Sequence, residues 1–445
     1  MTHWHAMLSS VTFIAVIFLI MTEWINLTVA AFLGALILVF AHVMTLEEAI
    51  GYIAQSHSTL ALFFGVMVLV RAFEATKIFD YLAMQILLLV KGEGKRLLIG
   101  IIALTAPICA FLPNATTVML LAPLIPPIAK EFSVNFVPLL VLMVFVANSA
   151  GLLTSVGDPV TFLVSDAINL NFGDYLFRLS FVGLLSIAIV AIALPVLFRK
   201  TWRTKLDILI YIPHPHIHHP EALSMGVLIF SFVLIFFVIG EYLPVPISPA
   251  AVALLGAGLA MLVSHHSRID TVNNILRDID WSTLIFFMST FVLIGGLEKT
   301  GVIQGFAAIL ATTIGKNIFF GSIILLIITG ILSSIVPNIP LVVAMIPLLK
   351  QYLVNVGLVG TEVLTPDFQG QLPPTVLPLF YAMLFGASLG GNGTLVGASS
   401  NIVAAGIAQQ YGRRISFKGF LKYSIPITVL QLIAATIYLL IRFLG

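Results

Sequence analysis

Pro113-Asn114-Ala115-Thr116-Thr117 is a short polar stretch between two apolar runs, and a related stretch, Pro337-Asn338-Ile339-Pro340, follows 224 residues later. Each is followed by an apolar, helix-like run that reaches another proline, Pro123 or Pro347, at the same spacing. Polar side chains are costly in hydrocarbon, so we expect them in a protein-lined cavity where they bind a solute. The two stretches are therefore predicted to be the tips of two hairpins that meet around a substrate site.

The composition of the chain indicates its class. Of the 445 residues, 60% are hydrophobic and 9% are charged, which suits side chains exposed to lipid and not a surface exposed to water. We predict an all-α polytopic protein of the cell inner (cytoplasmic) membrane. A net charge of +2 without a basic face indicates no nucleic-acid partner. Cys109 is the only cysteine, so neither an internal disulfide nor a cysteine metal centre is expected.

The second half of the chain repeats the first. At an offset of 224 residues the halves share Thr59 with Thr283, Phe63 with Phe287 and Glu74 with Glu298. Further along the offset becomes 240, and Gly157 then falls on Gly397. Such a duplication is typical of transporters in which discontinuous helices from two repeats meet at the membrane midplane.

The predicted architecture is a pair of inverted-topology repeats, each with about five crossings, one re-entrant hairpin and one broken helix. The first repeat covers residues 1–198, with its hairpin at about 96–130 and its broken helix at about 135–170. A cytoplasmic linker, 199–221, leads to the second repeat, 222–445, with its hairpin at about 317–350 and its broken helix at about 374–409.

Lysine and arginine predict the orientation, because cytoplasmic loops retain them. If the hairpins re-enter instead of crossing, most of the 21 basic residues share one face, including the cluster at 199–205. We assign that face to the cytoplasm and both termini to the outside. The linker also carries His214, His216, His218 and His219. These histidines could bind a metal, although a histidine cluster in a linker is more often only solvated.

Polar residues at the tips and breaks are the candidate binding groups. Asn114, Thr116 and Thr117 can cap the arm that follows them, and Asn338 can do the same in the second half. Asp158-Pro159 has the pattern of an N-cap followed by a first-turn proline. Helix ends with amide and hydroxyl side chains suit an anion or a neutral hydroxylated solute. Capping without ligand contact is the alternative for all these residues, and for Asp158 it stands level with a role in coupling.

Four stretches carry a family resemblance: Phe111-Leu112-Pro113-Asn114-Ala115-Thr116-Thr117, Gly157-Asp158-Pro159, Pro337-Asn338-Ile339-Pro340 and Gly390-Gly391-Asn392-Gly393-Thr394-Leu395-Val396-Gly397-Ala398-Ser399-Ser400-Asn401. They resemble the signatures of the ion transporter superfamily, closest to its ArsB arsenite-efflux and P-protein branch, with NhaD antiporters and divalent anion:sodium symporters as relatives. The resemblance spans nearly the whole chain. It implies scaffold and transport domains with elevator-like alternating access. It also implies a substrate or ion site at Asn114, Thr116, Thr117, Asp158, Asn338, Asn392, Thr394, Ser399 and Asn401.

The chain departs from those relatives at the tips. Pro113 and Pro337 stand where the P-protein and NhaD branches usually have aspartate, and Thr161 stands near a position where many relatives have asparagine. The missing tip carboxylates leave Asp158 as the main titratable group near the site. This favours an anion or a neutral oxyacid over cation antiport.

We therefore predict a secondary active transporter, not an enzyme, that exports arsenite or antimonite by proton coupling. Arsenite near neutral pH is an uncharged trihydroxide, which amide and hydroxyl groups could bind without thiolates. Asp158 is the predicted proton carrier. The alternatives are a sodium- or proton-coupled carrier of carboxylates or inorganic anions, and a sodium/proton antiporter. A hydrolase is disfavoured, because the apolar spans show no His-Glu-x-x-His or comparable motif.

No cofactor is expected other than a proton or sodium as the coupling ion, and no resident metal. The expected partners are a small inorganic solute or anion and membrane lipid. The sequence leaves open whether the carrier is a homodimer and whether a cytoplasmic arsenical ATPase docks on its basic face.

Overall fold

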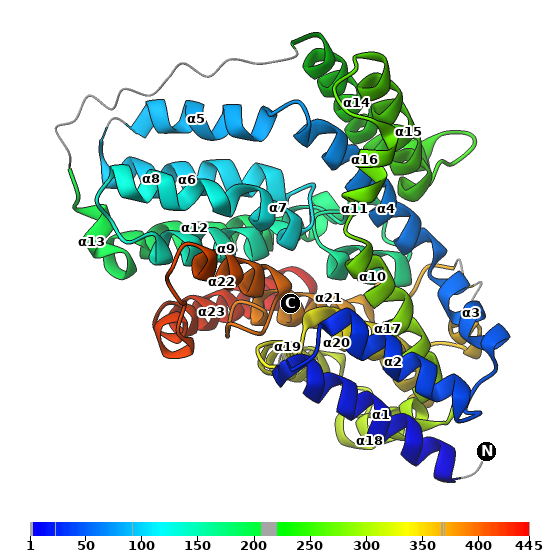
Figure 1. Cartoon of the computed structure of the whole chain (residues 1–445). Helices are drawn as coiled ribbons and strands as arrows, with labels where there is room; N and C mark the ends of the chain where they lie inside the picture. Colours follow the sequence, from blue (N-terminus) through cyan, green and yellow to red (C-terminus); the bar gives the residue numbers. More distant parts are fainter. Residues whose placement is uncertain are drawn as a thin grey trace.

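The computed structural model describes residues 3–22, 24–90, 92–205, 220–365, 368 and 370–444, and in these ranges the chain is helical without sheet strands (Figure 1). The linker histidines, His214 to His219, lie outside the described residues. Nine helices in the described part are long and apolar enough to cross a membrane: His3–Thr22, His57–Glu74, Phe136–Leu153, Ser180–Leu197, Pro220–Tyr242, Pro249–His266, Trp281–Lys299, Asn338–Asn355 and Phe417–Phe443. The prediction of an all-α polytopic membrane protein is confirmed.

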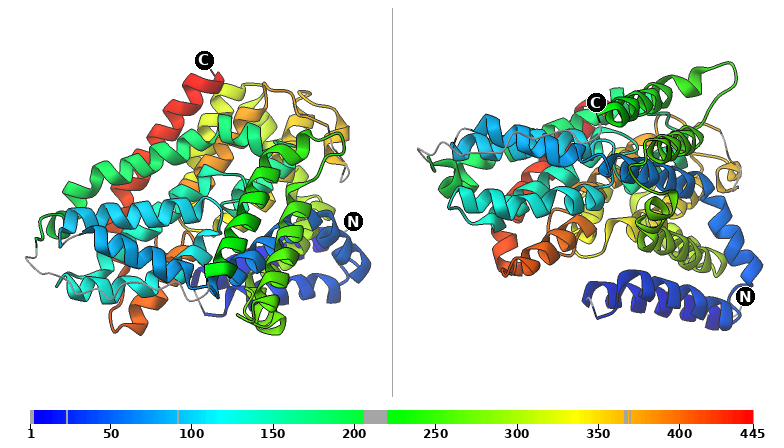
Figure 2. Two further views of the ribbon diagram at one scale, coloured as in Figure 1. Left: turned by 90° about the horizontal axis from the view of Figure 1, so that it is seen from above. Right: turned by 45° about the horizontal axis from the view of Figure 1, so that its top comes forward.

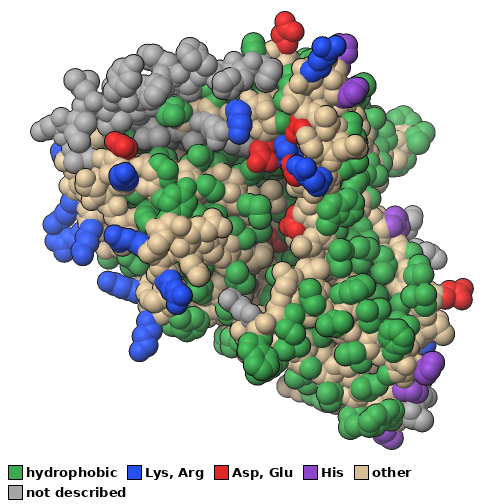
Figure 3. All heavy atoms as spheres, in the orientation of Figure 1, with side chains coloured by type: hydrophobic (Ala, Val, Ile, Leu, Met, Phe, Trp, Pro, Cys, Tyr) green, Lys and Arg blue, Asp and Glu red, His purple; other side chains and the backbone are tan. Residues whose placement is uncertain are grey.

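Helices α4 (His57–Glu74) and α17 (Trp281–Lys299) contribute residues to the wall of the candidate site. Helix α4 packs along α15 (Pro249–His266), and α17 packs along α2 (Leu27–Phe40). Helix α1 (His3–Thr22) lies beside α2 at one edge of the molecule, as both views of Figure 2 show. Hydrophobic side chains cover much of the surface over these edge helices (Figure 3), as expected of a surface that faces lipid.

Each predicted hairpin consists of helices joined by a short turn that ends in proline. The first contains α6 (Gly94–Cys109), α7 (Asn114–Leu121) and α8 (Ile125–Glu131), and the second contains α19 (Ile318–Ser333) and α20 (Asn338–Asn355). Pro113 and Pro337 take the N-cap positions of α7 and α20, with φ/ψ of −52/139° and −52/136°. Proline suits the start of a helix because its fixed φ fits there and it has no N–H to leave unpaired.

Each predicted broken helix consists of two helices separated by a glycine-containing turn. These are α9 (Phe136–Ala150) with α10 (Pro159–Ala167), and α21 (Leu377–Gly390) with α22 (Ser399–Gln410). A Cβ on Gly157 would lie 2.9 Å from the carbonyl oxygens of Cys109 and Ala110, at the end of α6. A Cβ on Gly397 would lie 2.9 Å from the carbonyl oxygen of Ser333, at the end of α19. In each half, therefore, glycine lets the break lie directly against the hairpin.

Candidate functional site

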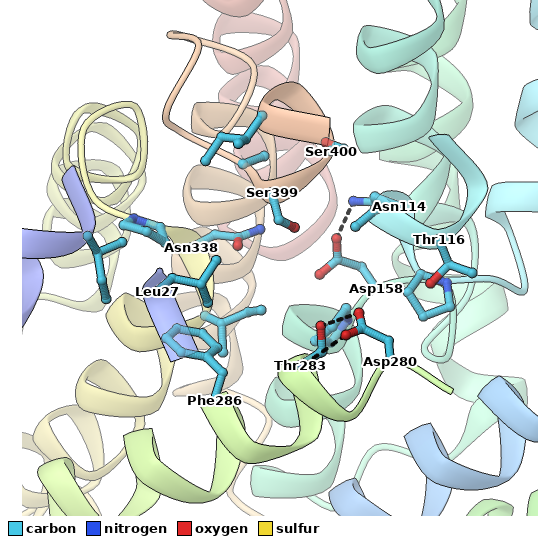
Figure 4. A pocket seen from close by; sticks show the side chains of 18 of the residues that line it. Leu27, Asn114, Thr116, Asp158, Asp280, Thr283, Phe286, Asn338, Ser399 and Ser400 are labelled. Carbon is cyan, nitrogen blue, oxygen red and sulfur yellow. Dashed lines mark hydrogen bonds between the residues drawn. The ribbon is translucent and has the colours of Figure 1, made fainter. Parts of the chain in front are cut away.

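Both hairpin tips and both breaks line one small cavity, with a volume of about 90 Å³. Asn114 and Asn338 reach it from the tips, and Asp158 and Ser399 reach it from the breaks. Figure 4 shows these side chains around the shared space, with Asp280, Thr283 and Phe286 of the α17 segment on a further wall. Segments from both halves of the sequence thus contribute polar groups to the same cavity.

In the first half, the polar groups bind each other. Asp158 is the N-cap of α10, as the sequence predicts, and its Oδ1 accepts a 2.8 Å hydrogen bond from the backbone N–H of Val160. Its Oδ2 accepts a hydrogen bond from the Asn114 side-chain amide. The Thr161 hydroxyl accepts a 3.2 Å hydrogen bond from the Asp158 backbone N–H and completes a capping box. Asp158 is 3% exposed, so this carboxylate is buried, and each of its oxygens accepts one hydrogen bond.

In the second half, the corresponding groups are left without partners. The Asn338 side chain is only 8% exposed and makes no hydrogen bond to any described residue. Ser399 lines the same cavity and is exposed to it. A buried amide without a partner loses free energy unless a solute or water satisfies it. These side chains are therefore the groups available to a ligand.

Capping by the tip asparagines does not occur. Asn114 and Asn338 are the first residues of α7 and α20, and the N-cap prolines before them provide no side-chain hydrogen bond. Helix α22 begins after Ala398, which also provides none. Three helix N-termini at the cavity thus lack a side-chain cap, and each presents backbone N–H groups and the positive end of its dipole. Two helices at the cavity do have a carboxylate at this position, α10 with Asp158 and α17 with Asp280, whose Oδ1 accepts a 3.0 Å hydrogen bond from the backbone N–H of Thr283.

The remaining predicted site residues lie in different places. Thr116 lines the cavity. Thr117 is fully buried and is absent from the cavity lining, and its hydroxyl has no hydrogen-bond partner among the described residues. Asn392, Thr394 and Asn401 also do not line the cavity. Instead they brace the second break: Asn401 Nδ2 donates to the carbonyl oxygens of Gly391 and Thr394 at 2.8 and 2.7 Å.

A buried amide network behind this break was not predicted. Asn148 Nδ2 donates to Asn392 Oδ1 at 2.9 Å and to Asn401 Oδ1 at 3.1 Å. Asn392 in turn donates to Gln431 at 3.0 Å. A single amide within an apolar span is costly unless paired, and that cost was the signal that could have found Asn148 and Gln431. The network connects α9, the second break and α23 (Phe417–Leu439).

A second cavity, of about 390 Å³, is lined by the other ends of α10, α17 and α20, which also reach the central cavity. Its lining includes Asp166, Glu298 and Lys350. Helix α17 lines both cavities, with Thr283 and Phe286 at the central one and Phe291 and Glu298 at the second.

Three buried phenylalanines lie between the cavities. Phe63 contacts Phe287 and Phe162, with ring centroids 5.4 and 6.2 Å apart. The three rings form an aromatic layer between the residues that line the central cavity and those that line the second.

A membrane-spanning helical chain whose broken helices and hairpin tips surround a small polar cavity has the features of a membrane transporter. The model of the family described as citrate transporter (CitMHS) matches residues 17–365. The chain belongs to this family, and it is a multi-pass protein of the cytoplasmic membrane.

Curated relatives include a protein described as a transporter, and one solved structure shares the fold. An uncharacterized transporter of Synechocystis sp. is 65% identical over 433 residues, which cover 97% of this chain and 96% of the relative. The human P protein is 26% identical, over 95% of this chain and 58% of its own length. The crystal structure of the YdaH transporter of Alcanivorax borkumensis matches with a TM-score of 0.54 at 13% identity, covering 88% of this chain and 86% of that one. The last likeness concerns the fold alone.

Proposed function

We propose that the chain is a secondary active transporter that moves a small, oxygen-rich solute across the cytoplasmic membrane and is coupled to protons through Asp158. The observation that carries this proposal is the shared cavity, in which a buried carboxylate lies with the unpartnered amide of Asn338 and the hydroxyl of Ser399. Buried carboxylates within membrane spans are typical of proton and ion pathways. Sodium is the alternative coupling ion.

Alternating access is the mechanism that the two cavities support. In this mechanism a solute passes from the central cavity to the second cavity when the contact of Phe162, on α10, with Phe63, on α4, opens. Helices α10 and α20 both run from the central cavity to the second. The elevator-like movement that the sequence resemblance implies would carry these helices past α4 and α17 and separate the rings.

An anion is the substrate class that the site favours. Three uncapped helix N-termini and the unpartnered amide of Asn338 offer hydrogen-bond donors and positive partial charge to the cavity. The family description, citrate transporter, supports a carboxylate in particular. Export of arsenite or antimonite is the second candidate, because a neutral trihydroxide also suits amide and hydroxyl groups. A cytoplasmic ATPase docked on the basic face would be expected only if the substrate is arsenite or antimonite.

A flux screen with the purified protein in liposomes tests the proposal. Citrate, succinate, phosphate, arsenite and sodium are each offered with a pH gradient and with a sodium gradient. We expect saturable, gradient-driven uptake of one anion, together with counterflow, which a passive channel does not produce. Absence of saturable, gradient-driven flux for every solute would contradict the assignment, and flux of arsenite alone would favour the second candidate.

A further inference from the structure

An apolar groove of about 570 Å³ lies between α12 (Ser180–Leu197) and α23. Its lining consists of six apolar residues from each helix. Some of them are strongly exposed, such as Ile192 and Val196, at 76% and 75%. The small residues Ala193 and Ala434 lie among the larger side chains, which leaves the groove hollow. It shares no lining residue with the central cavity, so it is a separate site.

Ring contacts near both ends of the groove hold the two helices in opposite directions. At one end Phe198 stacks on Tyr423, with ring centroids 5.1 Å apart. At the other end Phe181 stacks on Tyr438, with ring centroids 5.4 Å apart. The end of α12 therefore lies beside the beginning of α23, and the groove between them has a defined shape with two distinct ends.

The length of the groove matches one leaflet of a bilayer. Its α12 residues run from Leu185 to Leu197, which is about 18 Å at the rise of an α-helix. The hydrocarbon core is about 30 Å thick, so one leaflet contributes about 15 Å. An acyl chain that lies along the groove therefore reaches the level of its headgroup at one end of it.

Cationic side chains lie at one end of the groove. Helix α13 (Arg199–Trp202) follows α12 directly, and its Arg199 and Lys200 are exposed. On α23 the exposed Lys422 lies four residues before Pro426, a lining residue, and so on the same face of the helix. These three cations have no ion pair among the described residues, and α12, α13 and α23 contain no Asp or Glu. Lys and Arg side chains gather at the end of the molecule where α13 lies (Figures 1 and 3).

We propose that this groove binds an anionic phospholipid from the leaflet on the basic side of the membrane. One acyl chain lies between α12 and α23, and the phosphate lies beside Arg199, Lys200 and Lys422. Basic pockets between membrane helices recognise anionic headgroups, because each Lys or Arg near the surface attracts them. A zwitterionic headgroup has its own cation beside the phosphate, so the three side chains favour the anionic lipid. The inference concerns a second ligand and does not depend on the proposed transport function.

A comparison of two lipids tests the proposal. Phosphatidylglycerol and phosphatidylcholine with the same acyl chains are titrated into the purified full-length protein in detergent, and the rise in Tm measures binding. We expect phosphatidylglycerol to act at a concentration at least tenfold lower than phosphatidylcholine. This preference should shrink in about 1 M salt, because salt screens the charges. Inorganic phosphate alone should not raise the Tm, since it cannot occupy the apolar groove.

Charge variants locate the headgroup. Lys422→Gln should weaken phosphatidylglycerol binding about fivefold, and the double variant Arg199→Gln with Lys200→Gln should weaken it about 25-fold. Binding of phosphatidylcholine should change less than twofold in both, which a general loss of structure would not produce. Arg442→Gln is the matched control, because it removes one cation from the segment that follows α23, beyond the opposite end of the groove. It should leave phosphatidylglycerol binding within twofold of the wild type.

A third variant, Ala193→Leu, fills the groove and should weaken the binding of both lipids about tenfold. Ala251→Leu in α15 is its control, because Ala251 is exposed and lies outside the groove. The inference is overturned if the wild type binds both lipids equally, if folded charge variants bind phosphatidylglycerol as the wild type does, or if Arg442→Gln weakens binding as much as Lys422→Gln. It is also overturned if Ala193→Leu dissociates an oligomer without affecting lipid binding, since a second copy of the chain would then cover the groove.

Discussion

At the scale of single residues, the first half contributes the carboxylate of Asp158 to the site, and the two tip asparagines differ in their partners. The side-chain amide of Asn114 donates a hydrogen bond to Asp158, whereas the Asn338 side chain has no hydrogen-bond partner among the described residues. The sequence identified both asparagines and Asp158 as candidates, because polar groups within apolar runs are costly unless they bind something. It did not reveal that Asp158 binds Asn114, since the partner of a side chain depends on the packing of segments far apart in the sequence.

Replacement of Asp158 by asparagine should separate coupling from folding. Asparagine caps a helix about as well as aspartate, so α10 should keep its N-terminus and the protein should fold. The titratable side chain at position 158 is lost, and we expect pH-gradient-driven uptake in liposomes to disappear while solute counterflow persists. Asp174→Asn is the matched control, because Asp174 lies in α11 (Phe172–Arg178), outside the central cavity lining, and its loss should leave coupling intact. Unchanged proton coupling in Asp158→Asn would refute the role of Asp158.

At the scale of elements, the breaks are positioned by glycines that lie against the ends of the hairpins. The sequence predicted the breaks from glycine and proline, but it did not indicate on which side of a break each polar residue lies. Asn392, Thr394 and Asn401 turn away from the cavity to brace the break, while Ser399 turns towards it. Side-chain direction at an irregular turn is set by local backbone angles and tertiary contacts, which residue types alone do not define.

Substitution of Gly157 by alanine should disturb the contact of the first break with its hairpin. The added Cβ would lie within 3.0 Å of three backbone carbonyl oxygens, which cannot move without shifting the tip or the break. We expect a loss of about 1–3 kcal/mol in the free energy of unfolding, with reduced uptake. Gly406→Ala in α22 is the matched control, because nothing lies within 4 Å of its Cβ, and it should be neutral or stabilising. Equal effects of the two substitutions on Tm would contradict the close approach at Gly157.

An ion-pair cluster connects the end of α4 to the segment before α17. Arg71 Nη2 lies 3.0 Å from Asp270 and 2.7 Å from Asp278. Hydrogen bonds from Arg71 and Arg277 hold the pKa of Asp278 below its ordinary value. Because the pKa of Asp278 is lower in the folded state than in the unfolded state, where it is about 3.9, the ionised side chain stabilises the folded protein above that pH. This contribution is lost as the pH falls through the pKa that Asp278 has in the folded state.

The variant Arg71→Met should therefore be less stable than the wild type near neutral pH, and the difference in Tm should shrink as the pH falls below about 4. Thermal unfolding of both proteins across this range measures the effect. Lys418→Met is the control, because Lys418 is exposed and has no ion pair among the described residues. A difference between Arg71→Met and the wild type that is the same at pH 6 and pH 3.5 would argue against the ionic origin of this contribution.

At the scale of the whole molecule, composition predicted the membrane class and the internal repeat predicted that distant segments would meet. The cavity contains residues from both halves, and the aromatic layer pairs Phe63 with Phe287, which correspond at the offset of 224 residues. The amide network and the second cavity were not predicted. They arise from packing between α9, α23 and the second break, and from the ends of α10, α17 and α20, and no local pattern in the sequence encodes such contacts.

Thiol labelling with substrate protection tests whether both hairpin tips line one solute site. In a Cys109→Ala background, single cysteines replace Ala115 and Ile339, which line the cavity from the first and the second tip. We predict that a thiol reagent modifies both cysteines. The transported anion, with citrate as the first probe, should slow both modifications to the same extent and with the same concentration dependence. Protection of only one cysteine, or of neither, by a solute that the protein transports would contradict the shared site.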